Sequence, residues 1–388
     1  MPVRTAVVGT GTVSRKHLAG IRSNPRAELV AVCDVDESAA LSAAREFGAR
    51  AETDVSSLLE TDIDCLHVCT PVQTHFDIAR RAIESDVAVL IEKPATTTVE
   101  EVEKLDELAR ERDVPATVVH NHLFDAALRK SRELIDAGEI GRIKGVDVVY
   151  AGLTRPDVEN RGSWVFDLPG GEFEEGLPHP LYAALGIGGF PRSDDDVSAQ
   201  TALSEEYEDD FDYDLAQVQY VSEDDALCSV KMLSGTQPQR LHVVDGTDGS
   251  LVVDEINQSV FRVDRDYTAS TIARSRKAID VSASQLANSL SNTKLVFDNA
   301  VGGSWEAETR IQSHSALFER FTATILDDAP VPVPLEQSRW TIRLMEHVRD
   351  AARAPATAPT IDDGAEEVRA EGDEVTDAEA DPVRTEID

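Results

Sequence analysis

The feature that most constrains the fold is the regular alternation of short apolar runs with amphipathic stretches between residues 3 and 121. The apolar runs are rich in β-branched residues and predict strands, while the stretches between them have helical spacing. Strands that alternate with helices in this way form parallel sheets with helices on both faces. The sequence therefore predicts a doubly wound α/β domain, with strands at 4–8, 29–33, 65–69, 87–91 and 116–119 and helices at 14–23, 37–47, 75–84 and 99–112.

The pattern changes beyond about residue 138. Within each segment apolar residues then alternate with polar ones, and turns such as Ser222-Glu223-Asp224-Asp225 join neighbouring segments. This pattern is typical of β-hairpins. Hairpins join antiparallel strands without crossover helices. We therefore expect a second, α+β domain with a large, mostly antiparallel sheet, with strands at 144–150, 197–203, 215–221, 226–233, 240–245, 250–253 and 260–263 and helices at 126–137, 305–326 and 336–352.

Together these patterns predict three parts. A Rossmann domain is expected over residues 1–122, and a domain for substrate binding and dimerisation over 123–354. Residues 355–388 contain twelve acidic residues and no aromatic residue. Such a segment buries too little apolar surface to offset its ordering entropy, so it is predicted to be a disordered acidic tail.

The net charge of −36 is spread over the whole chain, with 73 acidic residues against 37 basic ones, of which eight are lysines. This balance resembles proteins from salt-in halophiles, in which salt screens the repulsion between surface carboxylates. Repulsion from phosphates argues against nucleic acid as a partner.

Other sequence features bear on location and metals. No apolar run approaches the roughly 20 residues of a membrane span, and the first residues show no secretory signal, so a cytoplasmic protein without a membrane partner is expected. The cysteines fall mostly in apolar runs without ligand spacing and are interpreted as core residues, so no metal site is expected. They are Cys33, Cys65, Cys69 and Cys228.

A glycine-rich turn follows the first predicted strand. Gly9 permits a tight turn and Gly11 a close approach to a pyrophosphate, while Thr12 and Val13 lead into a helix whose N-terminus attracts negative charge. Asp34 ends the second strand, where its carboxylate can accept hydrogen bonds from a ribose and would repel a 2′-phosphate. The turn predicts an NAD site, with NADP less favoured. The alternatives are an ordinary turn and an exposed loop acid.

Two further turns carry a resemblance to a known family. The strand ending at Cys69 leads into Thr70, Pro71 and, four residues on, His75; the next leads into Glu92-Lys93-Pro94. With these motifs the chain resembles the Gfo/Idh/MocA family of glucose–fructose oxidoreductase-like and inositol dehydrogenase-like enzymes over about residues 3 to 350. The resemblance implies that both turns border the nicotinamide, that Lys93 is the active-site lysine and that the Lys93–Pro94 peptide is cis. Lys93 in a surface ion pair, and His75 as an orienting residue for its helix, remain alternatives.

The segment from Gly170 to His179 is similar to the family's Gly-Gly-x-x-x-Asp-x-x-x-His pattern, with Glu175 in place of Asp and Pro178 directly before the histidine. Residues four apart share one helix face, so Glu175 is expected to orient the His179 imidazole. The alternatives are a solvated acid and a structural histidine.

The resemblance implies an NAD-dependent dehydrogenase of a sugar, sugar derivative or cyclitol, working as a homodimer or homotetramer. His179 would take the hydroxyl proton and Lys93 would polarise the same oxygen. Asn121 and His122, after the sixth predicted strand, are candidates for lining the substrate pocket or for stabilising a turn. Two other functions stay open: a catalytically silent NAD-binding regulator, and a sugar enzyme that keeps NAD bound as a redox relay.

Overall fold

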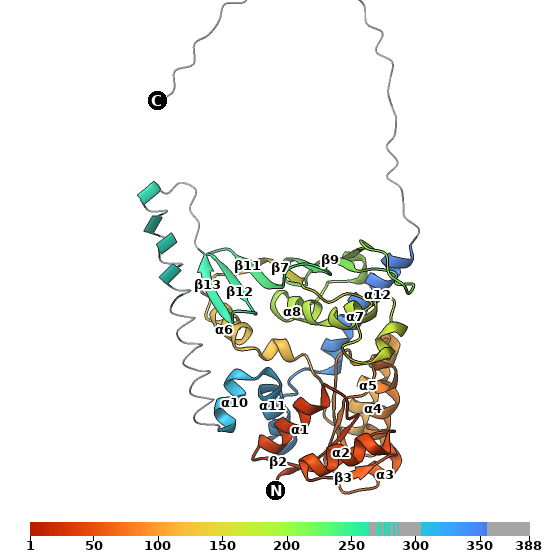
Figure 1. The fold of residues 1–388 in the computed structure, drawn as a ribbon. Helices are drawn as coiled ribbons and strands as arrows, with labels where there is room; N and C mark the ends of the chain where they lie inside the picture. Colours follow the sequence, from red (N-terminus) through yellow and green to blue (C-terminus); the bar gives the residue numbers. More distant parts are fainter. Residues whose placement is uncertain are drawn as a thin grey trace, which may run out of the picture. The chain divides into compact units, whose positions relative to one another are not determined.

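The structure is a computed structural model that describes residues 1–263 and 304–354, together with scattered positions between 270 and 286 (Figure 1). Met1–Arg353 form one compact unit. The predicted tail at 355–388 lies outside the described residues. Within the described part, no helix has both the length and the apolar character that crossing a membrane requires.

Six parallel strands form the first sheet in the order β3-β2-β1-β4-β5-β6. The order reverses between β1 and β4, and the carboxyl ends of strands at such a point flank the crevice in which doubly wound sheets bind ligands. The sequence predicts five of these strands but misses β3, because three residues without an apolar run give no signal. The strands are β1 Val3–Val8, β2 Ala27–Cys33, β3 Arg50–Glu52, β4 Cys65–Val68, β5 Ala88–Ile91 and β6 Ala116–Val118.

Helices connect these strands, and side chains cap three of them, one being α3, where the Asp54 carboxylate accepts from the nitrogen of Ser57. Asp36 accepts hydrogen bonds from the backbone of Ser38 and Ala39 at the start of α2. Thr98 and Glu101 form a reciprocal capping box at the start of α5. Each cap contributes about 1 kcal/mol to helix stability. The helices are α1 Ser14–Ser23, α2 Glu37–Phe47, α3 Val55–Leu59, α4 His75–Glu84 and α5 Val99–Arg112.

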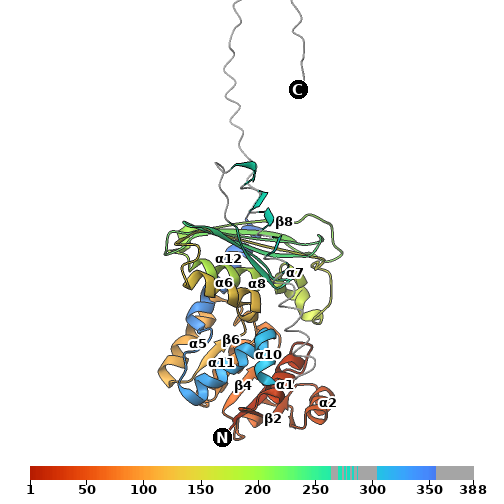
Figure 2. The same cartoon turned by 90° about the vertical axis from the view of Figure 1, so that its left-hand side faces the viewer.

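Seven strands form the second sheet in the order β13-β12-β11-β7-β10-β9-β8. All neighbours pair antiparallel except β7 and β10. Helices α6, α8 and α12 cover one face of this sheet (Figure 2), which confirms the predicted architecture. The elements are β7 Ile143–Ala151, β8 Val197–Ala202, β9 Leu215–Val221, β10 Leu227–Leu233, β11 Gln239–Gly246, β12 Ser250–Asp254, β13 Ser259–Val263, α6 Ala126–Asp136, α7 Gly171–Gly176 and α8 Pro178–Gly188.

The last helices pack against both halves of the chain. α11 (Ser313–Asp327) contacts α1 and β1, and α12 (Leu335–Arg353) contacts α5 and β8. The sequence predicts one helix over 305–326, but α10 (Trp305–Ile311) ends before α11 because Gln312 is extended, with φ −94° and ψ 117°. A domain boundary near residue 122 remains a proposal.

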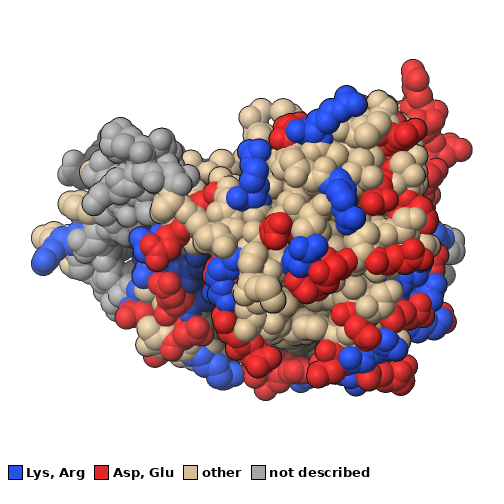
Figure 3. All heavy atoms as spheres, turned by 90° about the horizontal axis from the view of Figure 1, so that it is seen from below, with Lys and Arg blue, Asp and Glu red and all other residues tan. Residues whose placement is uncertain are grey.

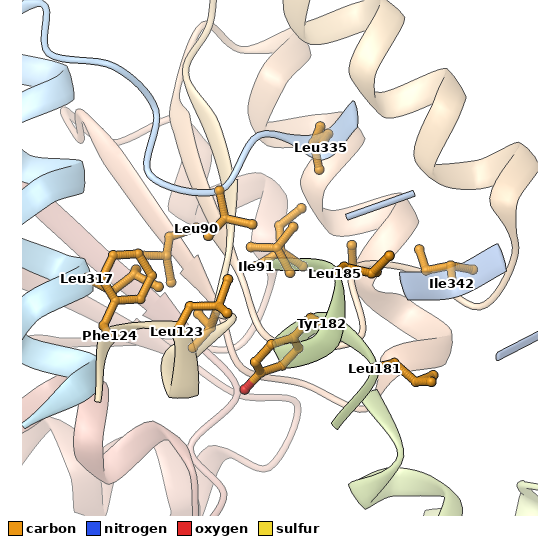
Figure 4. Packing of buried hydrophobic residues seen from close by; sticks show 14 of the residues in the cluster. Leu90, Ile91, Leu123, Phe124, Leu181, Tyr182, Leu185, Leu317, Leu335 and Ile342 are labelled. Carbon is orange, nitrogen blue, oxygen red and sulfur yellow. The ribbon is translucent and has the colours of Figure 1, made fainter. Parts of the chain in front are cut away.

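One buried cluster joins the two sheets (Figure 4). Leu90 and Ile91 of β5 are fully buried with Tyr182 of α8 and Leu335 of α12. Full burial of such side chains contributes roughly 1.5–3 kcal/mol each. The cluster therefore fixes α8, which carries His179, relative to the first sheet. The four cysteines are buried, as the sequence predicts, and none of them forms a disulfide.

Candidate active site

The turn between β1 and α1 is shaped for close approach by a ligand. Gly9 has φ 86°, and a Cβ there would lie 2.6 Å from the carbonyl oxygen of Cys69. A Cβ at Gly11 would meet no protein atom within 4 Å, so the space beside it is open. Thr12 is exposed, and no side chain caps the helix at Val13. Because an uncapped helix start attracts phosphate, this turn fits the pyrophosphate of a dinucleotide.

Asp34 lies against the same turn. Its Oδ2 accepts hydrogen bonds from the backbone nitrogen and the hydroxyl of Thr10, at 2.8 and 2.7 Å, and its Oδ1 accepts one from the nitrogen of Asp36 at 3.0 Å. A carboxylate has about four acceptor positions, so one remains for a ribose hydroxyl. The neighbouring Val35 is 94% exposed and carries no charge that would bind a 2′-phosphate.

His75 connects the two family turns instead of facing a ligand. Its Nδ1 lies 2.9 Å from the carbonyl oxygen of Pro94 and its Nε2 lies 2.8 Å from that of Thr70. Both ring nitrogens are thus engaged within a buried contact, which favours the orienting role over cofactor binding. Thr70 and Pro71 are half-buried after β4. The Lys93–Pro94 peptide is cis, as the resemblance implies.

Glu92 is a buried carboxylate that supports the second turn. Its Oε2 accepts a hydrogen bond from the nitrogen of Lys93 at 3.1 Å, and its Oε1 lies 2.8 Å from Nε2 of His17. Burial alone would raise the pKa of Glu92, but the His17 hydrogen bond and the charges of His17, His314 and Lys93 together outweigh it and lower the pKa to about 2. Glu92 therefore holds the lysine's backbone in place, and His17 is a support that the sequence analysis missed.

Lys93 reaches away from that turn toward the second domain. Its side chain is 7% exposed, and its ammonium donates to the carbonyl oxygen of Glu175 at 2.9 Å and pairs with the carboxylate of the same residue. Nη1 of Arg161 lies 2.9 Å from the other carboxylate oxygen. An ammonium has three donors, so this arrangement leaves one N–H for a substrate oxygen.

The expected pairing of Glu175 with His179 is wrong. α7 ends at Gly176 and α8 begins at Pro178, whose missing N–H interrupts the helical hydrogen bonds. Glu175 pairs with Lys93, whereas Nδ1 of His179 lies 2.7 Å from the hydroxyl of Tyr182. Tyr182 is a site residue that the sequence analysis does not single out, although its three-residue spacing from His179 could have indicated the contact.

His179 is half-buried and lies among basic side chains. Its ring centroid lies 4.4 Å from that of His122, which belongs to the 3-10 helix Asn121–Phe124 after β6. Burial, followed by the charges of His122 and Lys93, holds the pKa of His179 well below 6.5. The imidazole is thus neutral at pH 7 and able to accept a proton. The structure thus places His122 beside His179, with Lys93 near enough for its charge to act on the same imidazole.

Behind His122 lies a network that the sequence did not indicate. The Glu255 carboxylate lies 2.9 Å from Nδ1 of His122, 2.5 Å from Nε2 of His242 and 2.5 Å from the hydroxyl of Tyr150. Burial would raise the pKa of Glu255, but the hydrogen bonds from His122 and His242 and the charges of these two histidines together outweigh it and lower the pKa. This anion fixes His122 next to His179. Its members lie far apart in the sequence, so no spacing reveals it.

The fold and this site combine a Rossmann-type parallel sheet and its glycine turn with a lysine after β5 whose charge acts on a neighbouring histidine. The profile of the oxidoreductase family with an NAD-binding Rossmann fold matches residues 3–120, and that of the GFO/IDH/MocA C-terminal domain matches residues 128–252. The chain belongs to the Gfo/Idh/MocA family of oxidoreductases.

Several known proteins are similar to this chain. An inositol 2-dehydrogenase from Rhizobium meliloti is 30% identical over 159 residues, 41% of this chain and 48% of that protein. A scyllo-inositol 2-dehydrogenase (NAD(+)) from Bacillus subtilis is 35% identical over 156 residues, 39% of this chain and 44% of that protein. The matches thus span about half the length of these relatives.

Among solved structures, the WlbA dehydrogenase from Bordetella pertussis, in complex with NADH and UDP-GlcNAcA, superposes with a TM-score of 0.70. The two chains are 20% identical, and the match covers 91% of this chain and 97% of that one. At this identity the likeness establishes the shared fold.

Proposed function

We propose that the protein is an NAD-dependent dehydrogenase that oxidises a hydroxyl of a sugar, sugar derivative or cyclitol. The observation that carries this proposal is a lysine with a 7% exposed side chain, Lys93, near enough to His179 for its charge to lower the histidine's pKa, in a fold whose first glycine turn has open space beside Gly11. The family membership supports the cofactor, and the inositol dehydrogenases among the relatives support the substrate class.

The residues divide the chemistry between them. His179 takes the hydroxyl proton, and the free N–H of Lys93 donates to the same oxygen and stabilises the negative charge that develops there. NAD, when bound, supplies the hydride acceptor. Glu175 and Arg161 fix the ammonium, and Asn121 and His122 border the substrate side. The same groups serve the reverse reduction.

A screen of polyols, aldoses and sugar nucleotides tests the proposal by following NADH absorbance in molar KCl. Turnover of at least one member is expected. Protein that binds NAD but oxidises none of them would favour a silent regulator. Nucleotide that copurifies with the protein and does not exchange with added NAD would favour the enzyme that keeps NAD bound as a redox relay. The fluorescence of bound NADH in the purified protein detects such a nucleotide.

The Asp34 carboxylate is expected to make the protein prefer NAD over NADP. Replacing Asp34 by Ser and Val35 by Arg removes the ribose acceptor and supplies a positive charge for a 2′-phosphate. Because a hydrogen bond to a charged group contributes about 1.5–3 kcal/mol, NAD affinity should fall roughly 10- to 100-fold while NADP affinity rises. Titration of protein fluorescence measures both dissociation constants. Tighter binding of NADP by the unmodified protein would show that Asp34 does not bind the adenosine ribose as proposed.

We also propose that the acidic surface makes stability depend on salt. Figure 3 shows acidic side chains distributed over one face of the molecule, with basic ones between them. The screening length falls from about 10 Å at 0.1 M salt to about 3 Å at 1 M, so repulsion across the surface weakens. The melting temperature should rise by about 10 °C between 0.1 and 2 M KCl, corresponding to a few kcal/mol. Sucrose of equal osmolality is the control, and equal stability at both salt concentrations would contradict the halophile interpretation.

Cytoplasmic location is a further proposal, and so is assembly as a homodimer or homotetramer, which rests on the family resemblance. Light scattering of the purified protein in molar KCl gives the mass of the assembly. A monomer across the micromolar range would contradict the oligomer.

A further inference from the structure

We propose that Tyr182 and Asn121 are positioning residues that hold His179 in the tautomer with its proton on Nδ1, so that Nε2 is left as the proton acceptor. The proposal rests on the function proposed above, in which His179 is the base. It assigns to a phenol and an amide the orienting role that the sequence suggested for Glu175.

The hydroxyl of Tyr182 lies at the centre of a small buried network. It is 2.7 Å from Nδ1 of His179, 3.2 Å from the backbone nitrogen of His122 and 3.3 Å from Oδ1 of Asn121. The tyrosine ring stacks on His120, with centroids 4.2 Å apart and planes 10° apart. Burial raises the pKa of Tyr182 well above 10, so the hydroxyl keeps its proton.

The number of protons in this network determines the tautomer. A phenol has one proton to donate and two positions that accept. The N–H of His122 can only donate, so it fills one accepting position. The Oδ1 of Asn121 can only accept, so it takes the proton of the hydroxyl. The remaining position must be filled by a donor, and the one group left is an Nδ1–H on His179.

A contact from the C-terminal helices orients the amide. Nδ2 of Asn121 donates to the hydroxyl of Ser313 at the start of α11, at 3.4 Å. The Ser313 hydroxyl donates its own proton to the Asp125 carboxylate, so it accepts from the NH₂ of Asn121, and Oδ1 of the amide is directed toward Tyr182. Had the amide turned over, its NH₂ would donate to Tyr182, and the hydroxyl proton would pass to Nδ1. The orientation of Asn121 therefore selects the protonated nitrogen of His179.

The tautomer matters because the ring is neutral. The titratable and charged groups that face it are His122 of the 3-10 helix, Lys93 after β5, Arg161 before α7 and Arg240 of β11, and positive charge on these groups adds to burial in lowering its pKa. A neutral imidazole with its proton on Nε2 would donate to the substrate hydroxyl and could not accept from it. Among the described residues, no carboxylate hydrogen-bonds to His179, so this orienting role passes to Tyr182.

Nitrogen NMR of ¹⁵N-histidine-labelled protein with bound NAD tests the tautomer directly. The signals of His179 are those that disappear in His179→Gln. We expect Nδ1 to be protonated and Nε2 to be unprotonated at pH 7. In Tyr182→Phe both tautomers should be populated, turnover should fall roughly 10- to 10³-fold, and KM and NAD affinity should barely change. A proton on Nε2 in the unmodified protein, or an unchanged tautomer in Tyr182→Phe, would overturn the proposal.

Tyr220→Phe is the matched control. Tyr220 on β9 is also buried, and its hydroxyl donates to the carbonyl oxygen of Gly189 at 3.1 Å, outside the site. Its loss costs one hydrogen bond and should leave the His179 signals and turnover unchanged. Loss of turnover in both variants with an unaltered tautomer would reduce Tyr182 to a packing residue and contradict the proposal.

Two replacements of Asn121 keep the test independent of Tyr182. Asn121→Asp remains an acceptor, so the tautomer should persist, and its negative charge should move the acid limb of the pH profile upward. Asn121→Leu removes the acceptor, so Tyr182 should donate to Nδ1 and the proton should shift to Nε2. An unchanged tautomer in Asn121→Leu would refute the proposal. A protein with the expected tautomers that oxidises no substrate would refute the proposed function and leave this inference standing.

Discussion

Replacing Lys93 by Ala is expected to lower turnover by about 100-fold or more while NAD affinity barely changes. The ammonium is buried and held by Glu175. The hydrogen bond that its remaining N–H donates to the substrate oxygen strengthens as negative charge develops on that oxygen. Loss of one such preorganised donor costs about 2.7–4 kcal/mol in the transition state. Initial rates with the best substrate from the screen measure turnover, and fluorescence titration measures NAD binding.

Two further variants distinguish the loss of the Lys93 ammonium from a general disruption of the fold. Lys104→Ala removes an exposed lysine that pairs with Glu100 one turn away on α5, and it should have no effect on turnover. Glu175→Gln keeps the carbonyl contact to Lys93 but removes its counter-charge, so it should cause a smaller loss than Lys93→Ala. Near-normal turnover in Lys93→Ala would refute the mechanism and favour a silent NAD-binding regulator.

The first domain could be predicted because its signals are local. Glycines at a strand end, an acid at the next strand end and an alternation of strands with helices each depend on neighbouring residues. β3 was missed because Arg50–Glu52 are only three residues long and pair with β2 without an apolar run. The break between α10 and α11 was missed because Gln312 has no intrinsic signal against helix, so its extended backbone is set by packing.

The site could be predicted only in part, because sequence patterns report local structure and not contacts between distant segments. Lys93 and His179 lie at positions that motifs mark. The partners of these residues depend on tertiary contacts: Glu175 meets a lysine 82 residues away, and Glu255 meets Tyr150 across 105 residues. Pro178 was recognised as unusual, but its consequence, the turning of Glu175 away from His179, needed the structure.

The second large effect is expected for His179→Ala, which should lower turnover of the oxidation roughly 10²- to 10⁴-fold, as for loss of a general base. In the unmodified protein the pKa of His179 lies below 6.5, because of burial and the neighbouring cations. The base is therefore already unprotonated at pH 7. The rate should be nearly constant through neutral pH and should fall only as the pH drops through that lowered pKa.

The variant should lose this acid limb and recover part of its rate at high pH, where hydroxide replaces the missing base. His347→Ala, at a half-buried histidine on α12 near Asp194, is the control and should keep the unmodified profile. Because Lys93 and His179 act on one oxygen, the double variant should lose less than the product of the two single losses. Fully multiplicative losses would mean that the two residues act in separate steps. An acid limb that survives in His179→Ala would assign the proton acceptor to another group, and His122, 4.4 Å away between ring centroids, would be the next candidate.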